Sequence, residues 1–178
     1  MSSRTAALVE VADQVSRKYI MDDVSSITYE PRITSSIASE LTVLTRTNMK
    51  KFYDGANLLE WIWDDEKKQN EFLNLKSHFF VSTNVGVDGF LCFRFMIDSK
   101  RPVQYIWELH ATVPGKGVGS RLLLEATRFC KSNTCVTFQV LTCFTANVGA
   151  LKFYKREGFS IDSSSPKGGP YVILSRTI

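Results

Sequence analysis

The stretch VPGKGVGSRLLL, from Val113 to Leu124, places three alternating glycines between an apolar run typical of a strand and an apolar run typical of a helix. Glycine has no Cβ atom, so its backbone can approach a ligand closely and adopt positive φ angles. The first amides of the following helix have no partner inside the helix, so they point N–H groups and the positive end of its dipole at an anion. The stretch therefore predicts a phosphate-binding turn. A strand-to-helix turn without a ligand is the alternative.

The spacing of Gly115, Gly117 and Gly119 excludes two common phosphate loops. A Walker A loop needs a lysine and a hydroxyl residue after its last glycine, whereas Lys116 lies between two glycines. A dinucleotide loop, GxGxxG, needs a glycine where Leu122 stands. The remaining pattern, GxG at the start of a helix, resembles the pyrophosphate loop of the Gcn5-related N-acetyltransferases.

Length and composition fit one globular domain. The chain has 178 residues, of which 44% are hydrophobic and 12% aromatic, and this suits a single substantial core. Its net charge of +4 is modest and its basic residues are dispersed, so direct nucleic-acid binding is not predicted. Its apolar runs fall far short of the roughly 18 residues of a membrane helix, and its N-terminus does not read as a signal peptide. We expect a monomer in the cytoplasm and nucleus, without membrane association.

The cysteines and histidines show no pattern of a metal or redox site. The four cysteines form no CxxC pair and have no histidine at metal-ligand spacing, so we expect reduced, packed thiols and no metal. His78 and His110 fit neither a catalytic triad nor a metal site. We therefore predict no chemical role for either histidine side chain.

Hydrophobic periodicity and capping residues predict a mixed α/β sheet with helices on both faces. A short amphipathic helix over residues 5–20 suggests a helical segment, 1–24, before the main domain, 25–178. Further helices are expected over residues 34–53, ended by Gly55, and over 64–75, 117–131 and 147–157, the last closed by Gly158. Strands are expected over residues 27–30, 78–83, 89–97, 102–112, 135–143 and 171–175.

Three parts of the sequence carry a resemblance to a known family. The order of strand YIWELHATV, loop PGKGVG, helix, strand and N-x-x-A-x-x-F-Y, at Asn147 to Tyr154, resembles the whole Gcn5-related N-acetyltransferase fold. The stretches MKKFYDGANLLEWIWDDEKK, Met49 to Lys68, and FSIDSSSP…YVILSR, Phe159 to Arg176, look like the N-alpha-acetyltransferase D family, the histone-specific N-terminal acetyltransferases. The likeness runs from about residue 28 to 176. It implies a mixed, mostly antiparallel sheet, flanked by helices, whose strands separate to form an acetyl-CoA cleft.

The resemblance also implies an activity. The family transfers acetyl from acetyl-CoA to the N-terminal α-amine of histone four and histone two-A tails, which begin Ser-Gly-Arg-Gly. An α-amine titrates at about 8 and a lysine at about 10.4, so the N-terminal substrate is partly neutral at physiological pH and needs only a modest base. Two alternatives stay open: acetylation of lysine side chains or small amines, and a module that binds acyl-CoA or a histone tail without turnover.

The chain departs from the family pattern at two positions. Pro114 stands where the superfamily loop usually begins with Gln or Arg, and proline removes one amide donor and one polar side chain. Met96 stands where the family commonly carries an acid, so the pocket for the tail's arginine is expected to be less charged.

Glu108 is the candidate catalytic residue. It lies within an otherwise apolar strand before the glycine loop, and by resemblance it binds substrate and takes the amine proton directly or through water. A solvent-facing position is the alternative, because Ile106, Glu108 and His110 share one face of a regular strand. We find no cationic partner for Glu108 in the sequence, so a substrate amine or arginine is expected to offset the cost of its burial.

The same resemblance implies acidic and aromatic residues around the substrate. Asp98 is the candidate partner, beside Glu108, for the tail's arginine, since paired hydrogen bonds between guanidinium and carboxylate are strong. Ser164 is a candidate for a backbone contact. The aromatic candidates, each of which could instead be a core residue, are Tyr53, Trp61, Tyr105, Trp107 and Tyr171.

Cofactor contacts are expected along the strand, the glycine loop and the next strand. The main chain of Leu109, His110 and Ala111 should pair with the pantetheine arm. The diphosphate should meet the amides of Gly115, Lys116, Gly117, Val118, Gly119 and Ser120.

The resemblance also implies roles for three residues that come after the glycine loop in the sequence. Thr142 and Asn147 lie where a separated strand would admit the cofactor, although Asn147 could simply cap its helix. Tyr154 resembles the superfamily tyrosine that protonates the leaving thiolate, with packing in the core as the competing interpretation.

Overall fold

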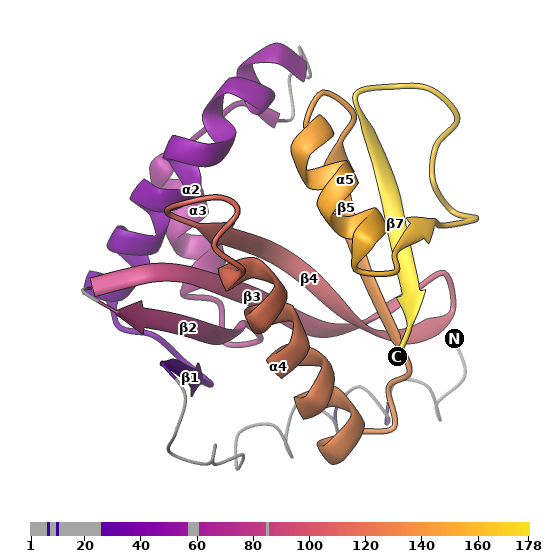
Figure 1. The fold of residues 1–178 in the computed structure, drawn as a ribbon, viewed down its shortest axis with the longest axis horizontal. Helices are drawn as coiled ribbons and strands as arrows, with labels where there is room; N and C mark the ends of the chain where they lie inside the picture. The colour runs from indigo at the N-terminus through magenta and orange to yellow at the C-terminus, as the bar shows by residue number, and fades with distance from the viewer. Residues whose placement is uncertain (1–6, 8–9, 11–25, 57–60, 85) are drawn as a thin grey trace.

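The computed structural model describes residues 7, 10, 26–56, 61–84 and 86–178. The helix expected over residues 5–20 falls almost wholly outside these residues. Within the described part, one seven-stranded sheet is flanked by four helices (Figure 1). Helices α2 and α3 pack on one face of the sheet, and α4 and α5 on the other.

The sheet runs in the order β1-β2-β3-β4-β5-β7-β6, and β4 with β5 is its parallel pair among the described strands. The helices are α2 Ser35–Ala56, α3 Asp65–Phe72, α4 Val118–Asn133 and α5 Val148–Arg156. The strands are β1 Ile27–Glu30, β2 His78–Asn84, β3 Gly86–Asp98, β4 Arg101–Ala111, β5 Phe138–Phe144, β6 Ser160–Ile161 and β7 Tyr171–Thr177.

Most expected elements are present, but α3 ends at Phe72, three residues before its expected end, and β3 begins at Gly86, three residues before its expected start. Three further differences follow. Helix α2 continues to Ala56, so Gly55 lies inside its last turn and does not end it. Strand β5 begins at Phe138 because the residues before it form a turn, in which the Val136 amide donates to Thr134 Oγ1 at 3.1 Å. The short β6 was not expected, since two residues carry no periodic signal.

The core consists of two aromatic layers, one on each face of the sheet. Neighbouring residues of β2 point to opposite faces, as the alternation of a strand requires. Phe80 packs with Phe129 of α4, with ring centroids 5.8 Å apart, whereas Phe79 packs with Phe72 of α3 at 6.0 Å. Each layer fixes its helices against the sheet.

A β-bulge in β4 changes the faces that its side chains occupy. Cys92 of β3 pairs with Glu108, but the next residue, Phe93, pairs with Ile106, so Trp107 is the extra residue. Ile106 packs in the α4 layer, while Trp107 and Glu108 both contact α3. The expectation that Ile106 shares a face with Glu108 is therefore wrong, because the bulge interrupts regular alternation.

Strands β4 and β5 separate after two paired positions. Their register covers Gln104 with Gln139 and Tyr105 with Val140, whereas β5 pairs with β7 along its whole length (Figure 1). At the junction, the buried Gln139 amide donates to Gln104 Oε1 at 2.6 Å. Among the described residues, the rest of β4 up to Ala111 thus has no strand partner on its β5 side.

Gly89 is expected to be intolerant of any side chain. A Cβ atom there would lie 2.6 Å from Val118 Cγ1 and 2.8 Å from the His110 carbonyl oxygen. Gly89→Ala should lower the free energy of unfolding by about 1–3 kcal/mol through overpacking. Thermal or urea unfolding measures this. Gly55→Ala is the control, because nothing lies within 4 Å of its Cβ and a helical alanine should stabilise slightly; equal stability of the two variants would contradict this packing.

Candidate active site

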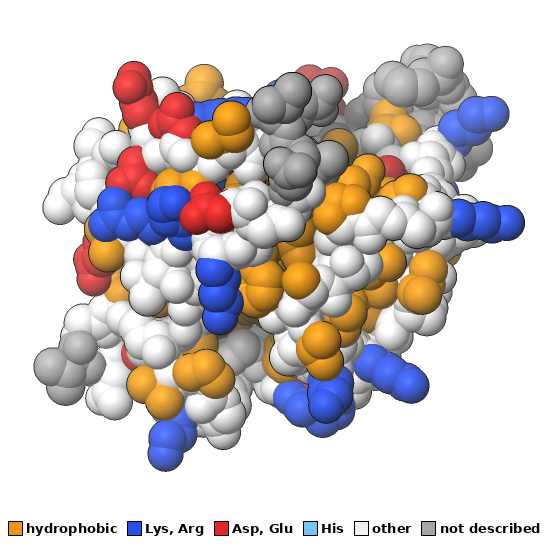
Figure 2. Space-filling model, turned by 90° about the horizontal axis from the view of Figure 1, so that it is seen from above, with side chains coloured by type: hydrophobic (Ala, Val, Ile, Leu, Met, Phe, Trp, Pro, Cys, Tyr) orange, Lys and Arg blue, Asp and Glu red, His pale blue; other side chains and the backbone are white. Residues whose placement is uncertain are grey.

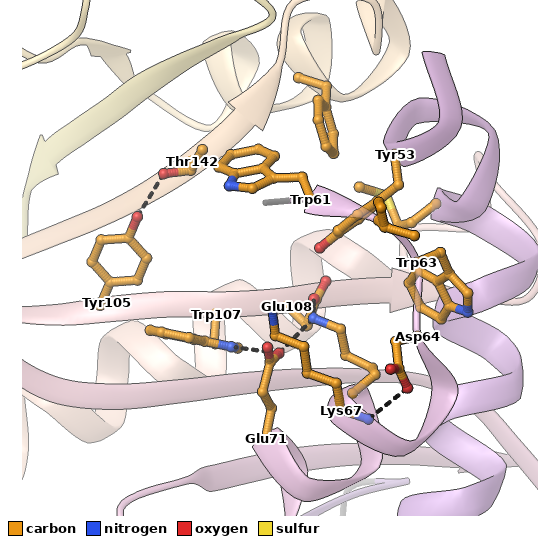
Figure 3. A pocket seen from close by; sticks show the side chains of 14 residues that line it. Tyr53, Trp61, Trp63, Asp64, Lys67, Glu71, Tyr105, Trp107, Glu108 and Thr142 are labelled. Atoms are coloured by element: carbon orange, nitrogen blue, oxygen red, sulfur yellow. Dashed lines mark hydrogen bonds and ion pairs between the residues drawn. The ribbon is translucent and has the colours of Figure 1, made fainter. Parts of the chain in front are cut away.

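A cavity of about 300 Å³ lies between α2, α3 and the separated strands β4 and β5 (Figure 3). Side chains from all four elements line the cavity, and they include acidic, basic and aromatic groups. Six predicted site residues line it: Tyr53, Trp61, Tyr105, Trp107, Glu108 and Thr142. The structure therefore brings together residues that lie far apart in the sequence.

Aromatic rings form one wall of the cavity. Trp61 stacks on Tyr171, with centroids 4.9 Å apart and planes at 23°, and meets Phe144 edge-on at 5.2 Å. Tyr53 meets Trp63 edge-on at 5.3 Å. Trp63 and Phe144 were not among the predicted site residues. Hydrophobic side chains also form a band across the adjoining face of the molecule, with basic groups near its edges (Figure 2).

Glu108 is held by two neighbours and is only 9% exposed. Its Oε1 accepts a hydrogen bond from Lys68 Nζ at 2.8 Å, and its Oε2 lies 2.8 Å from His110 Nε2. The Asn48 amide nitrogen lies 3.5 Å from His110 Nδ1, so Nδ1 accepts from Asn48 while Nε2–H donates to Glu108. The prediction that Glu108 lacks a cationic partner is therefore wrong, and the His110 side chain, for which no chemical role was predicted, contacts the candidate catalytic carboxylate.

The ion pair determines the charge of Glu108. Burial raises its pKa, but the Lys68 ammonium and the His110 hydrogen bond outweigh burial and lower the pKa to about 2. For Lys68 the signs of the two effects are reversed. Burial lowers its pKa, but the negative charges of Glu108 and Glu71 outweigh burial and raise the pKa above the ordinary lysine value. Both groups are therefore charged at physiological pH.

The lowered pKa of Glu108 predicts an acid-labile contribution to stability. A carboxyl whose pKa falls from 4.5 to about 2 on folding stabilises the protein above pH 4.5, and the contribution is lost as pH falls toward 2. Its size at neutral pH is on the order of 3 kcal/mol. Urea unfolding between pH 2 and 7 should show a shallower pH dependence for Glu108→Gln than for wild type. Superimposable slopes would mean that the carboxyl is not ion-paired in solution.

The short helix α3 supplies the partner that the sequence did not reveal. Asp64 caps its N-terminus by accepting from the Lys67 amide at 3.0 Å. Lys68 and Phe72, one turn apart, are the buried residues of this helix. Glu71 accepts from Lys68 Nζ at 2.6 Å and from the Trp107 indole at 3.2 Å. The only sequence signal for Lys68 was its place on the same helical face as Phe72.

The glycine loop has the geometry of an anion site. Gly115 and Gly117 have φ angles of +80° and +77°, which favour glycine, and the space beside both Cα atoms is open. Gly117 is the N-cap of α4 and provides no side-chain cap, so the first amides of the helix remain free for a ligand. A Cβ at Gly119 would lie 3.3 Å from Phe153 of α5, which makes this glycine a packing residue as well.

The other loop positions fit the same interpretation. Ser120 Oγ donates to Glu157 Oε1 at 2.6 Å, so its amide and not its hydroxyl is left for a phosphate. Lys116 is exposed, and Val118 is buried against the Gly89 region. The glycine loop and the helix terminus suit the diphosphate of coenzyme A, and the unpaired strand edge suits its amide-rich arm. The residues present therefore fit coenzyme A.

The residues predicted to surround the cofactor arm lie along the separated strands. Leu109 and Ala111 pack on the α4 layer, and their main chain lies on the edge that no described strand pairs with, although the Ala111 carbonyl oxygen accepts from Asn48 Nδ2 at 3.2 Å. The Tyr105 hydroxyl and Thr142 Oγ1 lie 2.6 Å apart and bridge β4 and β5. Asn147 Oδ1 accepts from the Ala150 amide at 3.1 Å, so the helix-cap interpretation of Asn147 is confirmed.

Tyr154 is buried in the α4 layer between Phe153 and Phe159, with ring centroids 5.1 and 5.5 Å away. The Tyr154 ring thus packs in the core, and a role toward the leaving thiolate stays a prediction. Among the described residues its hydroxyl makes no hydrogen bond, and burial and the nearby Cys143 and Glu108 raise its pKa. The phenol is therefore protonated and free to donate.

Two predicted substrate residues lie away from the cavity. Asp98 forms an ion pair with Arg101 at the turn of the β3–β4 hairpin. Cys92, the β3 residue that pairs with Glu108, lies six residues before Asp98, so roughly 20 Å of strand separates Asp98 from Glu108. Ser164 donates through its amide and hydroxyl to Asp162 Oδ1, at 2.9 and 2.7 Å. The structure does not place either residue beside Glu108.

The part of the chain that the structure describes has neither a metal-ligand cluster nor a membrane-spanning helix. It contains no group of three or more His, Cys, Asp or Glu side chains that could hold a metal ion. None of its helices is both long and apolar enough to span a bilayer. The four cysteines are free, and three of them are buried.

Solved structures share this fold. The PaiA N-acetyltransferase of Thermoplasma acidophilum, in complex with coenzyme A, is 20% identical, with a TM-score of 0.64 over 85% of this chain and 99% of its own. Arabidopsis thaliana NAA60, in complex with acetyl-CoA, is 15% identical, with a TM-score of 0.62 over 85% and 98%. Arabidopsis thaliana Naa50, in complex with the bisubstrate analogue CoA-Ac-MVNAL, is 19% identical, with a TM-score of 0.57 over 86% and 99%.

The sequence itself matches a protein family. Residues 44–159 match the acetyltransferase (GNAT) family, and this range is more than half of the chain. It includes the aromatic cavity, Glu108 and the glycine loop. As its sequence predicted, the protein belongs to the acetyltransferase (GNAT) family.

Proposed function

We propose that this protein is an N-alpha-acetyltransferase that acetylates the N-terminal serine of peptides beginning Ser-Gly-Arg-Gly, as in histone four and histone two-A tails. The observation that carries the proposal is the buried Glu108 carboxylate at an aromatic cavity beside an unpaired strand edge. The cavity is suited to a peptide end, because its walls are aromatic and its charged groups lie on one side, on α3 and β4.

The two stretches that resemble the N-alpha-acetyltransferase D family meet at this cavity. The first contributes Tyr53, Trp61 and Lys68 to the lining, and Tyr171 of the second stacks on the Trp61 ring. Their meeting supports a substrate of the same class.

Acetyl-CoA is the acetyl donor in this proposal. Relatives of the same fold solved with coenzyme A or acetyl-CoA support it, as do the free amides that follow Gly117. When bound, acetyl-CoA supplies an activated acetyl group, and the amine nitrogen forms the new C–N bond as the thioester C–S bond breaks. The main chain of Leu109 to Ala111 holds the cofactor arm, and the loop amides hold its diphosphate.

Glu108 orients the amine and accepts its proton. A carboxylate with a pKa of about 2 is a weak base, but an α-amine is partly neutral already and becomes strongly acidic once it has attacked the carbonyl. The protonated Tyr154 hydroxyl is the group that gives a proton to the departing thiolate. Asp64 and Glu71, which line the cavity with Glu108, replace Asp98 as the carboxylates for the tail's arginine.

Mass spectrometry tests the proposed function. The protein is incubated with acetyl-CoA and Ser-Gly-Arg-Gly-Lys peptides whose α-amine is either free or blocked. One acetyl group on the N-terminal serine of the free peptide, and none on the blocked peptide, is the expected result. Acetylation of the lysine in both peptides would favour the lysine-acetyltransferase alternative, and coenzyme A binding without turnover would favour a binding module.

A further inference from the structure

Two pairs of hydrogen-bonded side chains close one end of the gap between β4 and β5. The Tyr105 hydroxyl and Thr142 Oγ1 lie 2.6 Å apart on the side of the cavity (Figure 3). On the other face of the sheet, Gln139 donates to Gln104 Oε1 at 2.6 Å, and Gln104 donates to the Ala126 carbonyl of α4. The gap is thus open toward the glycine loop and closed at its other end, and the mechanism above uses neither pair.

The proposed path of coenzyme A points its acyl group at this closed end. The arm starts at the glycine loop and runs back along β4 from Ala111 to Leu109, so the thioester at its tip comes next to Glu108. An acyl chain that continues in this direction meets the Tyr105–Thr142 pair. A chain that turns into the cavity instead occupies the place of the amine, which must approach the thioester from the side of Glu108.

The register of the β3–β4 hairpin gives the depth of the gap beyond the thioester. Glu108 pairs with Cys92 and Tyr105 pairs with Arg94, so two residues of β3, roughly 7 Å, separate the levels of Glu108 and Tyr105. A carbon–carbon contact takes about 3.5–4 Å of this length and leaves about 3 Å. The remaining length suits the two carbons of an acetyl group and not the four carbons of a butyryl group.

We infer that the Tyr105–Thr142 pair is a wall that limits the acyl donor to short chains, and that Thr142 is a specificity-determining residue for the acyl group. The hydrogen bond holds both side chains across the gap, so neither can turn aside without losing its partner. The inference rests on the proposed path of coenzyme A and not on the identity of the peptide. Two surplus carbons against this wall should cost on the order of 100-fold in kcat/KM.

Acyl-CoA donors of different chain length test the inference. With Ser-Gly-Arg-Gly as acceptor, wild type should use butyryl-CoA with a kcat/KM about 100-fold or more below that for acetyl-CoA. Thr142→Ala removes two heavy atoms, as many as the carbons that distinguish butyryl from acetyl, so the ratio should fall to about tenfold or less. Steady-state kinetics with each donor measures this ratio, which a general loss of stability would not change.

Two further variants serve as controls. Thr142→Ser keeps a hydroxyl for Tyr105, so its donor preference should lie closer to wild type than to Thr142→Ala. Thr145→Ala is the matched control, because Thr145 follows β5, does not line the cavity, and donates to the Gly169 carbonyl at 3.3 Å; its donor preference should equal that of wild type. If Thr142→Ala does not fold, Tyr105→Leu opens the same end of the gap from β4 and gives the same readout.

Calorimetry with the acyl-CoAs alone separates this inference from the proposed function. Butyryl-CoA should bind wild type at least about tenfold more weakly than acetyl-CoA, whereas Thr142→Ala should bind both alike. A wild type that uses both donors equally, or a Thr142→Ala variant that keeps the full preference, would overturn the inference alone. Failure to acetylate the peptide would remove the proposed function, and the ratio of the two affinities would still decide the inference.

Discussion

Glu108→Gln is expected to lower kcat by about 100-fold or more, a typical loss when a proton acceptor is removed. Glutamine has nearly the same shape, and its one carbonyl oxygen can still accept from Lys68, but it carries no charge to orient the amine and cannot take its proton. Coenzyme A affinity should change less than threefold, because the loop amides and the strand edge are untouched. Steady-state kinetics together with calorimetry separate the two effects.

Glu66→Gln is the matched control for this experiment. Glu66 lies on the same helix as Lys68 and is exposed, so its kinetics should equal those of wild type. A Glu108→Gln enzyme with wild-type turnover would exclude Glu108 from the chemistry. A variant that lost coenzyme A affinity as well would indicate a structural role for the carboxylate.

Gly117→Val is expected to weaken coenzyme A binding at least tenfold. Gly117 has a φ of +77°, and a β-branched residue is strongly disfavoured there, so the loop must change conformation and its amides must move. Isothermal titration with coenzyme A measures the loss.

Gly168→Val provides a close control, because Gly168 has a φ of +76° and equally open surroundings but lies in the loop before β7. Both variants should lose about 1–2 kcal/mol of folding stability, and only Gly117→Val should lose affinity. Equal affinities would show that the glycine loop does not hold the cofactor.

The parts of the fold that the sequence predicted are those with a local signal. Gly115 and Gly117 adopt the positive φ angles that their spacing indicated, and Asn147 and Gly158 delimit α5 as capping chemistry requires. Alternating apolar residues located the strands. These features depend on residues within one or two turns of each other, which a single sequence contains.

The parts that the sequence did not predict depend on long-range geometry. Lys68 meets Glu108 across 40 residues of chain, and nothing near either residue indicates the contact. The bulge at Trp107 has no signature in residue type, yet it turns Glu108 toward α3. Asp98 is excluded from the cavity by the register of the hairpin, which no local pattern determined.

A crystal structure of the protein with coenzyme A tests the central claim most directly. The account predicts that the diphosphate accepts hydrogen bonds from the amides that follow Gly117, and that the arm runs along Leu109 to Ala111 with its sulfur near Glu108. Coenzyme A bound at another surface, or a glycine loop closed over its own amides, would contradict the account.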